Sequence, residues 1–291
     1  MDYLGYDIDK ILITGSQGFL GKEIVKKSKK LDPRHVRFVF TGLRNLENVF
    51  KCDLTFLADV NKLSEKVSPS LIIHCASYVP KNLTEYNDIN ASKKNCTMMK
   101  NLVSVFTCPI LFISSMAIYG EKSGKPIDEK EALEPSSAYG LGKKNAEGIL
   151  LKSNNPSLSV RIPGLYGFRR ESGLVYNLIN SMLNDTKIKL PQSPLLWAAM
   201  DVEDAAKIIL ELCFLDWSNI DAVNVSYDEK YSINRLVDIL NIKLNKEIDC
   251  NVNHPTFEYN LNLIKQMGVG MNFSFDNSLE KLINNLSSID N

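Results

Sequence analysis

Short runs of apolar, often β-branched residues alternate with longer amphipathic stretches through the first 162 residues of the chain. The short runs predict strands at residues 10–14, 36–41, 71–76, 109–114 and 158–162. The stretches between them repeat apolar residues about every third or fourth position and predict helices within residues 18–31, 56–67, 87–106 and 137–152. Strands without polar alternation are typical of parallel sheets covered on both faces. We therefore expect an α/β fold with a doubly wound parallel sheet.

The alternation weakens beyond residue 163, where loop-forming residues become frequent. The pattern still predicts helices at residues 202–216, 232–244 and 277–286, and one strand at residues 222–226. We therefore expect a larger domain over residues 1–163 and a smaller α/β lobe over residues 164–291, with some segments of the lobe returning to the first domain's sheet.

A glycine-rich turn follows the first predicted strand and opens the first predicted helix. Its sequence, TGSQGFLG at residues 14–21, has the spacing G-x-x-G-x-x-G. Gly15 allows a tight turn, Gly18 lets a pyrophosphate approach the backbone, and Gly21 lets the helix lie close to the sheet. An anion at this place meets free N–H groups at a helix N-terminus. The turn predicts the dinucleotide site of a Rossmann fold, made by Gly15, Gln17, Gly18, Phe19, Leu20 and Gly21.

The end of the second strand bears on the choice of dinucleotide. No Asp or Glu follows it to bind a ribose 2′-hydroxyl, whereas Arg44 is suited to a 2′-phosphate. This favours NADP, with NAD as the alternative if Arg44 is only a solvated surface residue. Asp53 and Leu54 close the next short strand and are expected beside the adenine, but Asp53 suits equally the N-cap of a helix near Thr55.

Three side chains carry the predicted chemistry: Ser115, Tyr139 and Lys143. Ser115 follows the fourth predicted strand, and the four-residue spacing puts Tyr139 and Lys143 one turn apart on one helix face. In this arrangement Tyr139 transfers a proton, Lys143 lowers the pKa of the phenol and holds the nicotinamide ribose, and Ser115 hydrogen-bonds the substrate oxygen. A Tyr and a Lys at this spacing also occur by chance in many helices. The order of the motifs favours a site at the carboxyl edge of the sheet.

The direction of the reaction decides how far the pKa of Tyr139 must move. An alcohol is oxidised at pH 7 only by a phenolate, and lowering a phenol pKa from about 10 to about 7 takes about 4 kcal/mol. A ketone is reduced with a proton from a neutral phenol. Reduction is therefore the less demanding reaction.

These motifs resemble the extended short-chain dehydrogenase/reductase family, in particular its nucleotide-sugar epimerases, dehydratases and reductases. The matching segments are TGSQGFLG, Cys52-Asp53-Leu54, Ile73-His74-Cys75-Ala76, Asn95, SSMAIYG, Tyr139 with Lys143, Arg161–Gly167, Met200–Ala205 and Asn224–Ser226. The resemblance implies that Ala76 and Ser114 also contact the dinucleotide. It further implies that the substrate meets Ser115, Met116, Tyr166 and Arg169, and that the chain forms a homodimer through helices in segments 86–107 and 138–152.

Departures from the family's motifs narrow the reaction. Met116-Ala117 stands where the family's dehydratases carry an Asp-Glu pair, so dehydration is disfavoured. The reductases that also epimerise use an additional Cys/His pair, and this chain's histidines are His35, His74 and His254. Of these, His74 falls in a predicted strand and is interpreted as a packed residue.

A second departure concerns the substrate's diphosphate. Leu195-Leu196 precedes Trp197 at the place where the family often has an arginine that clamps the nucleotide diphosphate. Arg169 and Arg170 are candidates to replace that charge, and surface solvation is the equal alternative for both.

Composition excludes several other classes. The 34 Lys and Arg balance 34 Asp and Glu, so no overall field attracts a nucleic acid or an anionic bilayer. The six cysteines are widely separated, which argues against a disulfide framework and a metal site. No apolar run reaches the roughly 18 residues of a membrane span, and the N-terminal segment has acids where a secretion signal has basic residues. We expect a cytoplasmic protein.

These observations favour an NADP-dependent reductase that acts on a keto group of a nucleotide-linked sugar. A nucleotide-sugar epimerase that retains its NAD(P) uses the same groups and is the close alternative. A protein that binds NADP only as a sensor is the alternative from a different class.

Overall fold

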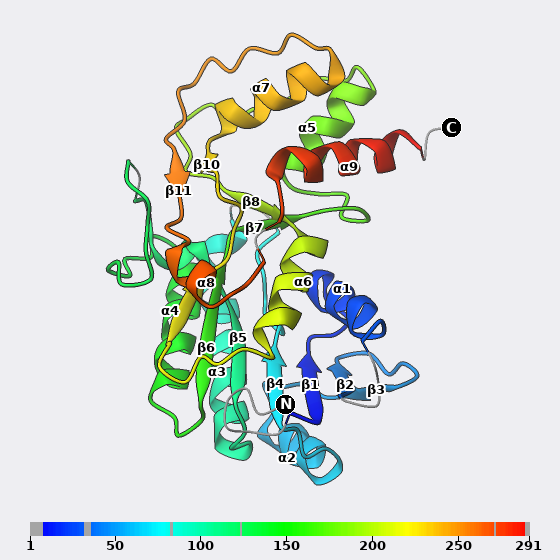
Figure 1. Cartoon of the computed structure of the whole chain (residues 1–291), viewed down its shortest axis with the longest axis vertical. Coiled ribbons are helices and arrows are strands. Elements are labelled where there is room, and N and C mark those ends of the chain that lie inside the picture. Colours follow the sequence, from blue (N-terminus) through cyan, green and yellow to red (C-terminus); the bar gives the residue numbers. More distant parts are fainter. Residues whose placement is uncertain (1–7, 32–35, 82–83, 123, 271, 289–291) are drawn as a thin grey trace.

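The computed structural model describes residues 8–31, 36–81, 84–122, 124–270 and 272–288. Residues 1–7, on which the expectation about a secretion signal rests, and His35 lie outside these ranges. The structure has a Rossmann-type sheet below a smaller group of helices and short strands (Figure 1).

The central sheet confirms the predicted fold class. Its seven strands follow the order β3-β2-β1-β4-β5-β6-β9, and every neighbouring pair is parallel. The strands are β1 (Lys10–Thr14), β2 (Arg37–Gly42), β3 (Val49–Lys51), β4 (Leu71–His74), β5 (Ile110–Ser115), β6 (Ser157–Ile162) and β9 (Ala222–Asn224). The order reverses beside β1, which leads into the glycine turn, and ligands of open α/β sheets bind at such a place.

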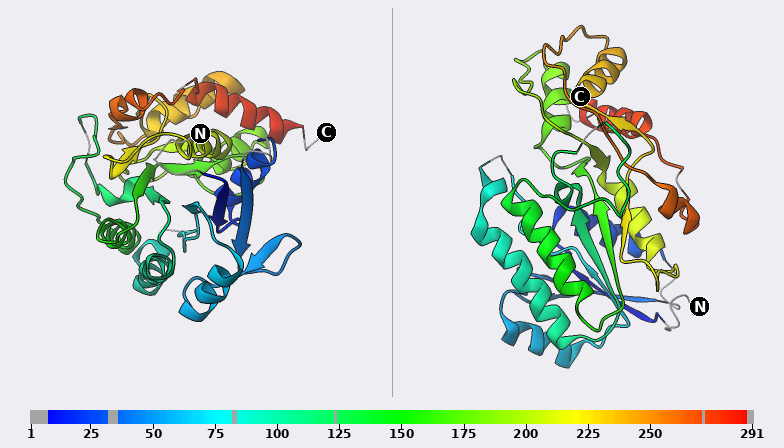
Figure 2. Two further views of the ribbon diagram at one scale, coloured as in Figure 1. Left: turned by 60° about the horizontal axis from the view of Figure 1, so that its bottom comes forward. Right: turned by 90° about the vertical axis from the view of Figure 1, so that its left-hand side faces the viewer.

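Helices cover both faces of this sheet, which explains why its strands are continuously apolar. One face carries α2 (Leu57–Lys66), α3 (Ile89–Val105) and α4 (Ala138–Leu151), and the other carries α1 (Phe19–Ser28) and α6 (Val202–Leu212) (Figure 2). Successive residues of β1 point to opposite faces. Leu12 is buried in the cluster that also holds Leu102 of α3, whereas Ile11 and Ile13 are buried in the cluster on the other face.

The second half of the chain contributes to both parts of the structure. The predicted helix at 202–216 is α6, which packs on α1, and the predicted strand at 222–226 is β9, which pairs with β6. Most of the rest forms the upper part in Figure 1: β7 (Gly164–Tyr166), α5 (Leu174–Leu183), β8 (Ala199–Asp201), β10 (Lys230–Tyr231), α7 (Ile233–Leu244), β11 (Phe257–Glu258) and α9 (Phe275–Ser287). Helix α8 (Asn262–Gln266) lies lower and contacts β9. Phe275 lies at the centre of this part, with its ring centroid about 6 Å from those of Tyr166, Trp197, Tyr227 and Tyr231.

Candidate active site

The glycine turn depends on the absence of side chains at two positions. Gly15 has a φ of +65°, and a Cβ there would lie 2.6 Å from the backbone nitrogen of Ala76. A Cβ on Gly21 would lie 2.2 Å from the carbonyl oxygen of Gly15. Gly18 is the N-cap of α1 and offers no side-chain hydrogen bond to the helix. The turn therefore packs backbone against backbone and leaves the start of α1 suited to an external anion.

Gln17 joins the glycine turn to the loop after β2. Its amide nitrogen donates to the carbonyl oxygen of Arg44 at 2.7 Å, and its amide oxygen accepts from the Arg44 N–H at 3.0 Å. Gly42 allows this contact, since a Cβ there would lie 2.6 Å from the Gln17 amide carbon. The exposed Arg44 is thus held beside the glycine turn, where we predict the ribose of the adenosine.

The acidic turn after β3 is held by local bonds. One carboxylate oxygen of Asp53 accepts from the backbone N–H and the hydroxyl of Thr55, at 2.9 and 2.7 Å. Helix α2 begins later, at Leu57, with Phe56 as its N-cap, so Asp53 caps the turn that precedes the helix. The carbonyl oxygen of the buried Leu54 accepts from the Asn101 side chain at 2.8 Å.

The predicted chemical groups meet at the carboxyl edge of the sheet. Ser115 is the last residue of β5, and Tyr139 and Lys143 lie on one face of α4. Ser115 and Tyr139 share a side-chain hydrogen bond, which lowers the pKa of Tyr139, although burial of the phenol raises that pKa more. The phenol is therefore protonated across the ordinary pH range.

Lys143 is buried next to the Tyr139 ring. Its Nζ donates to the carbonyl oxygen of Ile113 at 2.7 Å and lies 4.8 Å and 5.9 Å from the ring centres of Phe112 and Tyr139. Burial lowers the pKa of Lys143 to about 8, against the smaller opposing effects of Cys75 and Glu147. The ammonium is therefore poorly compensated by protein groups.

Two hydroxyls near these residues test whether a dinucleotide fits. Within the described residues, the buried oxygens of Ser77 and Ser114 have no hydrogen-bond partner. Ser77 follows β4, and Ser114 precedes Ser115 in β5. Buried hydroxyls are normally satisfied, so two without partners at the edge beside the glycine turn fit a polar ligand. The turn and these hydroxyls together suit a nicotinamide dinucleotide.

The histidines are engaged elsewhere. His74 is buried, its Nδ1 lies 2.8 Å from the Thr14 hydroxyl oxygen, and burial lowers its pKa to about 3. The Thr14 hydroxyl also accepts from the Ala76 N–H at 3.3 Å, so this pair supports the glycine turn. The Nδ1 atom of His254 accepts from the Leu195 N–H at 3.2 Å. These contacts give both residues structural partners.

The predicted substrate residues are less closely grouped. Met116 is half-buried and packs against the core, while Tyr166 is 4% exposed and its hydroxyl is bonded to Ser278. Arg169 is exposed, with a φ of 71° and its guanidinium 5.7 Å from the Phe168 ring centre. Contacts of Met116, Tyr166 and Arg169 with a substrate stay predictions.

Sequence reasoning missed Tyr86 as a neighbour of Tyr139, and it named Arg170 only as a candidate for the diphosphate. The ring of Tyr86 meets that of Tyr139 edge to face at 5.8 Å, and the charge of Arg170 lowers the pKa of both phenols. Tyr86 lies in a short 3₁₀ turn, Glu85–Asn87, far from Tyr139 along the chain, so no spacing pointed to it.

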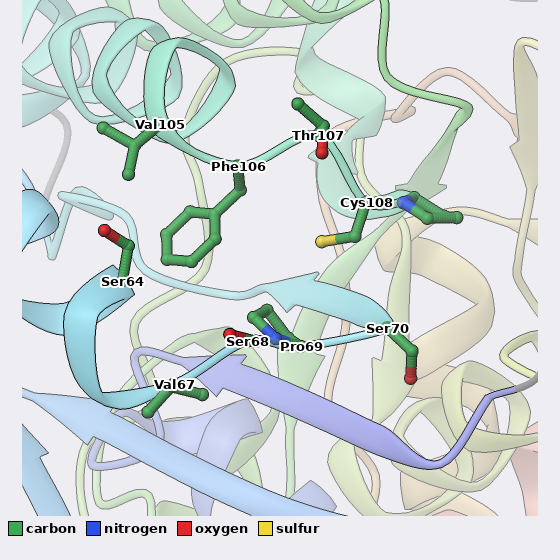
Figure 3. Close-up of a pocket in the computed structure, with 10 residues that line it drawn as sticks. Ser64, Val67, Ser68, Pro69, Ser70, Val105, Phe106, Thr107 and Cys108 are labelled. Carbon is green, nitrogen blue, oxygen red and sulfur yellow. The ribbon is translucent and has the colours of Figure 1, made fainter.

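A cavity of about 440 Å³ lies at the opposite edge of the sheet. It is lined by the segments that lead into β4 and β5, and in Figure 3 the Phe106 ring points from the end of α3 toward Ser68 and Pro69. None of the predicted site residues lines it, and its lining carries no charged side chain. The predicted site therefore lies at the carboxyl edge and not in this cavity.

Neither a metal site nor a membrane-spanning helix is found in the described ranges. No group of three or more His, Cys, Asp or Glu side chains is placed to hold a metal ion there. No helix in the same ranges is long and apolar enough to cross a membrane. All six cysteines are free.

Known proteins match this chain along most of its length. It is 28% identical over 257 residues to a putative UDP-glucose 4-epimerase of Methanocaldococcus jannaschii, with 79% of this chain and 81% of the relative covered. It is 26% identical over 262 residues to the dTDP-4-dehydro-6-deoxyglucose reductase of Escherichia coli, with 81% and 82% covered.

A solved structure and a family model agree with these relatives. The enzyme WbmG of Bordetella bronchiseptica, in complex with NAD and UDP, superposes with a TM-score of 0.80 at 18% identity, over 96% of this chain and 94% of that one. The family model described as "NAD dependent epimerase/dehydratase family" matches residues 11–221. The chain therefore belongs to the NAD dependent epimerase/dehydratase family and is an NAD(P)-dependent oxidoreductase of the extended short-chain dehydrogenase type.

Proposed function

We propose that the protein is an NADP-dependent reductase of a keto group on a nucleotide-linked sugar. The observation that carries the proposal is the meeting of Ser115, Tyr139 and Lys143 at the carboxyl edge, beside a glycine turn built for a dinucleotide. The curated relatives include one named as a dTDP-sugar reductase and one named as a putative UDP-sugar epimerase, which supports this substrate class.

The protonation of Tyr139 favours reduction over oxidation. Because burial raises the pKa of this phenol, its proton is available to a ketone oxygen that becomes an alkoxide. Ser115 donates a second hydrogen bond to the same oxygen, and the Lys143 ammonium stabilises the tyrosinate left behind. Oxidation requires the phenolate at the outset, which this environment disfavours.

The dinucleotide would be held by the glycine turn, by Ser114 and by the Lys143 ammonium. When bound, its nicotinamide supplies the hydride. We propose NADP rather than NAD, because Arg44 is exposed next to the glycine turn and its backbone is fixed by Gln17. We further propose that residues 1–163 hold the dinucleotide and that residues 164–291 supply most contacts to the nucleotide sugar.

The reaction is tested with NADPH and candidate ketosugars, starting with dTDP-4-dehydro-6-deoxyglucose. We expect loss of absorbance at the reduced-nicotinamide band and a reduced sugar product. Tyr139→Phe is expected to lower turnover by roughly 10²–10⁴-fold and to retain dinucleotide binding, because only the proton donor is lost. The matched control, Tyr86→Phe, removes a neighbouring hydroxyl and should keep most of the turnover.

Other outcomes identify the alternatives. A changed sugar without net oxidation of NADPH contradicts reduction and indicates an epimerase, a candidate favoured by the relative named as a putative UDP-glucose 4-epimerase. Dinucleotide binding with no conversion of any ketosugar, and no effect of Tyr139→Phe, indicates a sensor.

The choice of dinucleotide has a separate test. We expect Arg44→Ala to raise the Kd for NADPH about tenfold or more and to leave the Kd for NADH nearly unchanged, because only NADPH has the 2′-phosphate. Equal changes in both constants would contradict the role of Arg44.

Quaternary structure and location stay predictions. The helices α3 and α4 pack side by side on one face of the sheet (Figure 2) and expose Ile89, Leu141 and Leu151. We propose a homodimer through this face in a cytoplasmic enzyme. Light scattering of the wild type and of Leu141→Lys checks the dimer, and a wild-type mass of one chain contradicts it.

A further inference from the structure

Arg170 is a half-buried cation without an acidic partner. One guanidinium nitrogen donates to the carbonyl oxygen of Leu165 at 2.8 Å, and the guanidinium carbon lies 5.3 Å from the ring centre of Phe19. No Asp or Glu within the described part of the chain forms a salt bridge with it. A charge removed from water is costly unless a counter-charge or hydrogen bonds replace the solvent. Leu165 is the one hydrogen-bond acceptor that Arg170 has among the described residues, so most of its five N–H donors have no protein partner there.

Arg170 lies next to the glycine turn. Phe19, under the guanidinium, is the first residue of α1 and directly follows Gly18. The loop after β7 lies against this helix start, since a Cβ on Gly167 would be 3.7 Å from the tip of the Phe19 ring. Arg170 thus places a positive charge beside the N-terminus of α1, which already favours anions.

The charge of Arg170 also reaches the reacting phenol. It acts on both Tyr86 and Tyr139, whose rings are in edge-to-face contact. Arg170 therefore lies beside the place predicted for phosphates and close enough for its charge to act at the place predicted for proton transfer.

We propose that Arg170 is a diphosphate-binding residue of this site, placed at the join of the glycine turn and the Tyr86–Tyr139 pair. The proposal rests on the proposed function, because both a dinucleotide and a nucleotide sugar carry a diphosphate. A planar guanidinium suits bidentate hydrogen bonds to phosphate oxygens. If the diphosphate is that of the substrate, this charge takes the place of the arginine that is missing before Trp197.

Lys22 provides the control. It carries the same charge and lies in the first turn of α1, three residues after Phe19, but its side chain is exposed. A non-specific effect of surface charge on an anionic ligand would be shared by the two residues, whereas a built contact belongs to Arg170 alone.

The experiment measures Kd by titration calorimetry on the full chain, with NADPH in one arm and with UDP and dTDP in the other. We expect Arg170→Ala to raise the Kd at least about tenfold in one arm, because charge-assisted hydrogen bonds to the diphosphate are lost. Arg170→Lys should recover part of the loss, and Lys22→Ala should change Kd less than twofold. An effect on NADPH assigns the dinucleotide as the source of the diphosphate, and an effect on UDP or dTDP assigns the substrate.

Unchanged constants for Arg170→Ala in both arms would overturn the proposal, as would an equal effect of Lys22→Ala. Should Arg170→Ala not fold, Arg170→Gln keeps a donor for Leu165 without the charge and is read in the same way. If NADPH and nucleotides bind as expected but no ketosugar is reduced, only the proposed function fails. If the wild type reduces a ketosugar and Arg170 variants bind normally, only this inference fails.

Discussion

Two buried cations lie within a short distance along the chain and have opposite surroundings. Arg161 of β6 forms a two-point salt bridge with Glu147 at 2.8 and 3.2 Å and donates to the Tyr119 oxygen at 2.9 Å. Lys143 lies one turn before Glu147 on α4. Its ammonium donates to a backbone carbonyl oxygen and otherwise lies near aromatic rings. Burial acts to lower both pKa values, but Glu147 holds that of Arg161 above its usual value, while that of Lys143 falls to about 8.

The difference separates a charge that the protein compensates with a carboxylate from one that it leaves without a counter-charge. The Arg161 network continues through Tyr119, whose hydroxyl donates to Asn224 at 2.7 Å, and Asn224 is held by Glu129 at 2.8 Å. It ties α4, β6 and β9 together behind the site. Lys143 keeps an uncompensated charge on the same helix, which is available to a ligand or to a tyrosinate. The fully paired network around Arg161 therefore holds α4 in place, and α4 carries the unpaired Lys143.

The largest effect is expected when the paired region is broken. Glu147→Ala leaves the Arg161 charge buried with one phenol and one carbonyl, and should lower the free energy of unfolding by about 3–5 kcal/mol. Urea denaturation measures this loss. The control is the double variant Glu147→Leu/Arg161→Met, which removes both charges and should recover most of the stability. A single variant that loses under about 1 kcal/mol would contradict the importance of the pair.

Removal of the Lys143 charge should raise the free energy of unfolding instead of lowering it. A Lys pKa that falls from 10.5 to about 8 on folding means that the charged form destabilises the native state by about 3 kcal/mol below pH 8. Lys143→Met should therefore stabilise the fold at pH 7 by up to this amount while turnover is lost. The gain should shrink as the pH rises from 8 to 10.5, where the unfolded chain also loses its proton.

Thermal unfolding at pH 7 and pH 10 measures the effect of Lys143→Met. Lys144→Met is the matched control, because its half-buried side chain lies next along α4 and donates to the Leu133 carbonyl oxygen at 2.7 Å. A loss of stability in Lys143→Met at pH 7 would show that the charge is compensated after all.

A third, exposed group of charges should show the smallest effect. Glu203 of α6 meets Lys281 of α9 at 2.8 Å and Lys26 and Lys27 of α1 at 3.4 and 3.7 Å. Burial raises the pKa of Glu203, but Lys281 and the two other lysines lower it to about 2. Its contribution is therefore complete above pH 4.5 and lost as the pH falls toward 2.

Glu203→Gln should lower stability at pH 7 by only about 0.5–1 kcal/mol, because solvent and salt screen a partly exposed carboxylate. The effect should decrease further in 1 M salt, as measured by urea denaturation. Glu23→Gln, which removes a single partner of Lys26, is expected to have less effect than Glu203→Gln. A loss that is independent of salt would indicate packing rather than charge.

Much of the fold was predictable because local periodicity carries it. Strands at 10–14, 71–76 and 158–162 and the glycine turn are where the pattern placed them, since apolar runs and glycine spacing record the local backbone. Helix α5 was missed. Its residues lie between loop-forming segments, and its apolar side becomes evident only where α7 and α9 pack against it.

The candidate site, like the fold, was predictable from the sequence only in part. The sequence by itself determined the β–α alternation, the glycine turn and the shared face of Tyr139 and Lys143, because each of these depends on residues close together in the chain. Only the tertiary structure decided that Lys143 donates to Ile113, that Tyr86 borders the phenol and that Arg170 rather than Arg169 lies over Phe19. Charge, burial and hydrogen bonding depend on neighbours from distant segments, and spacing along one chain does not specify them.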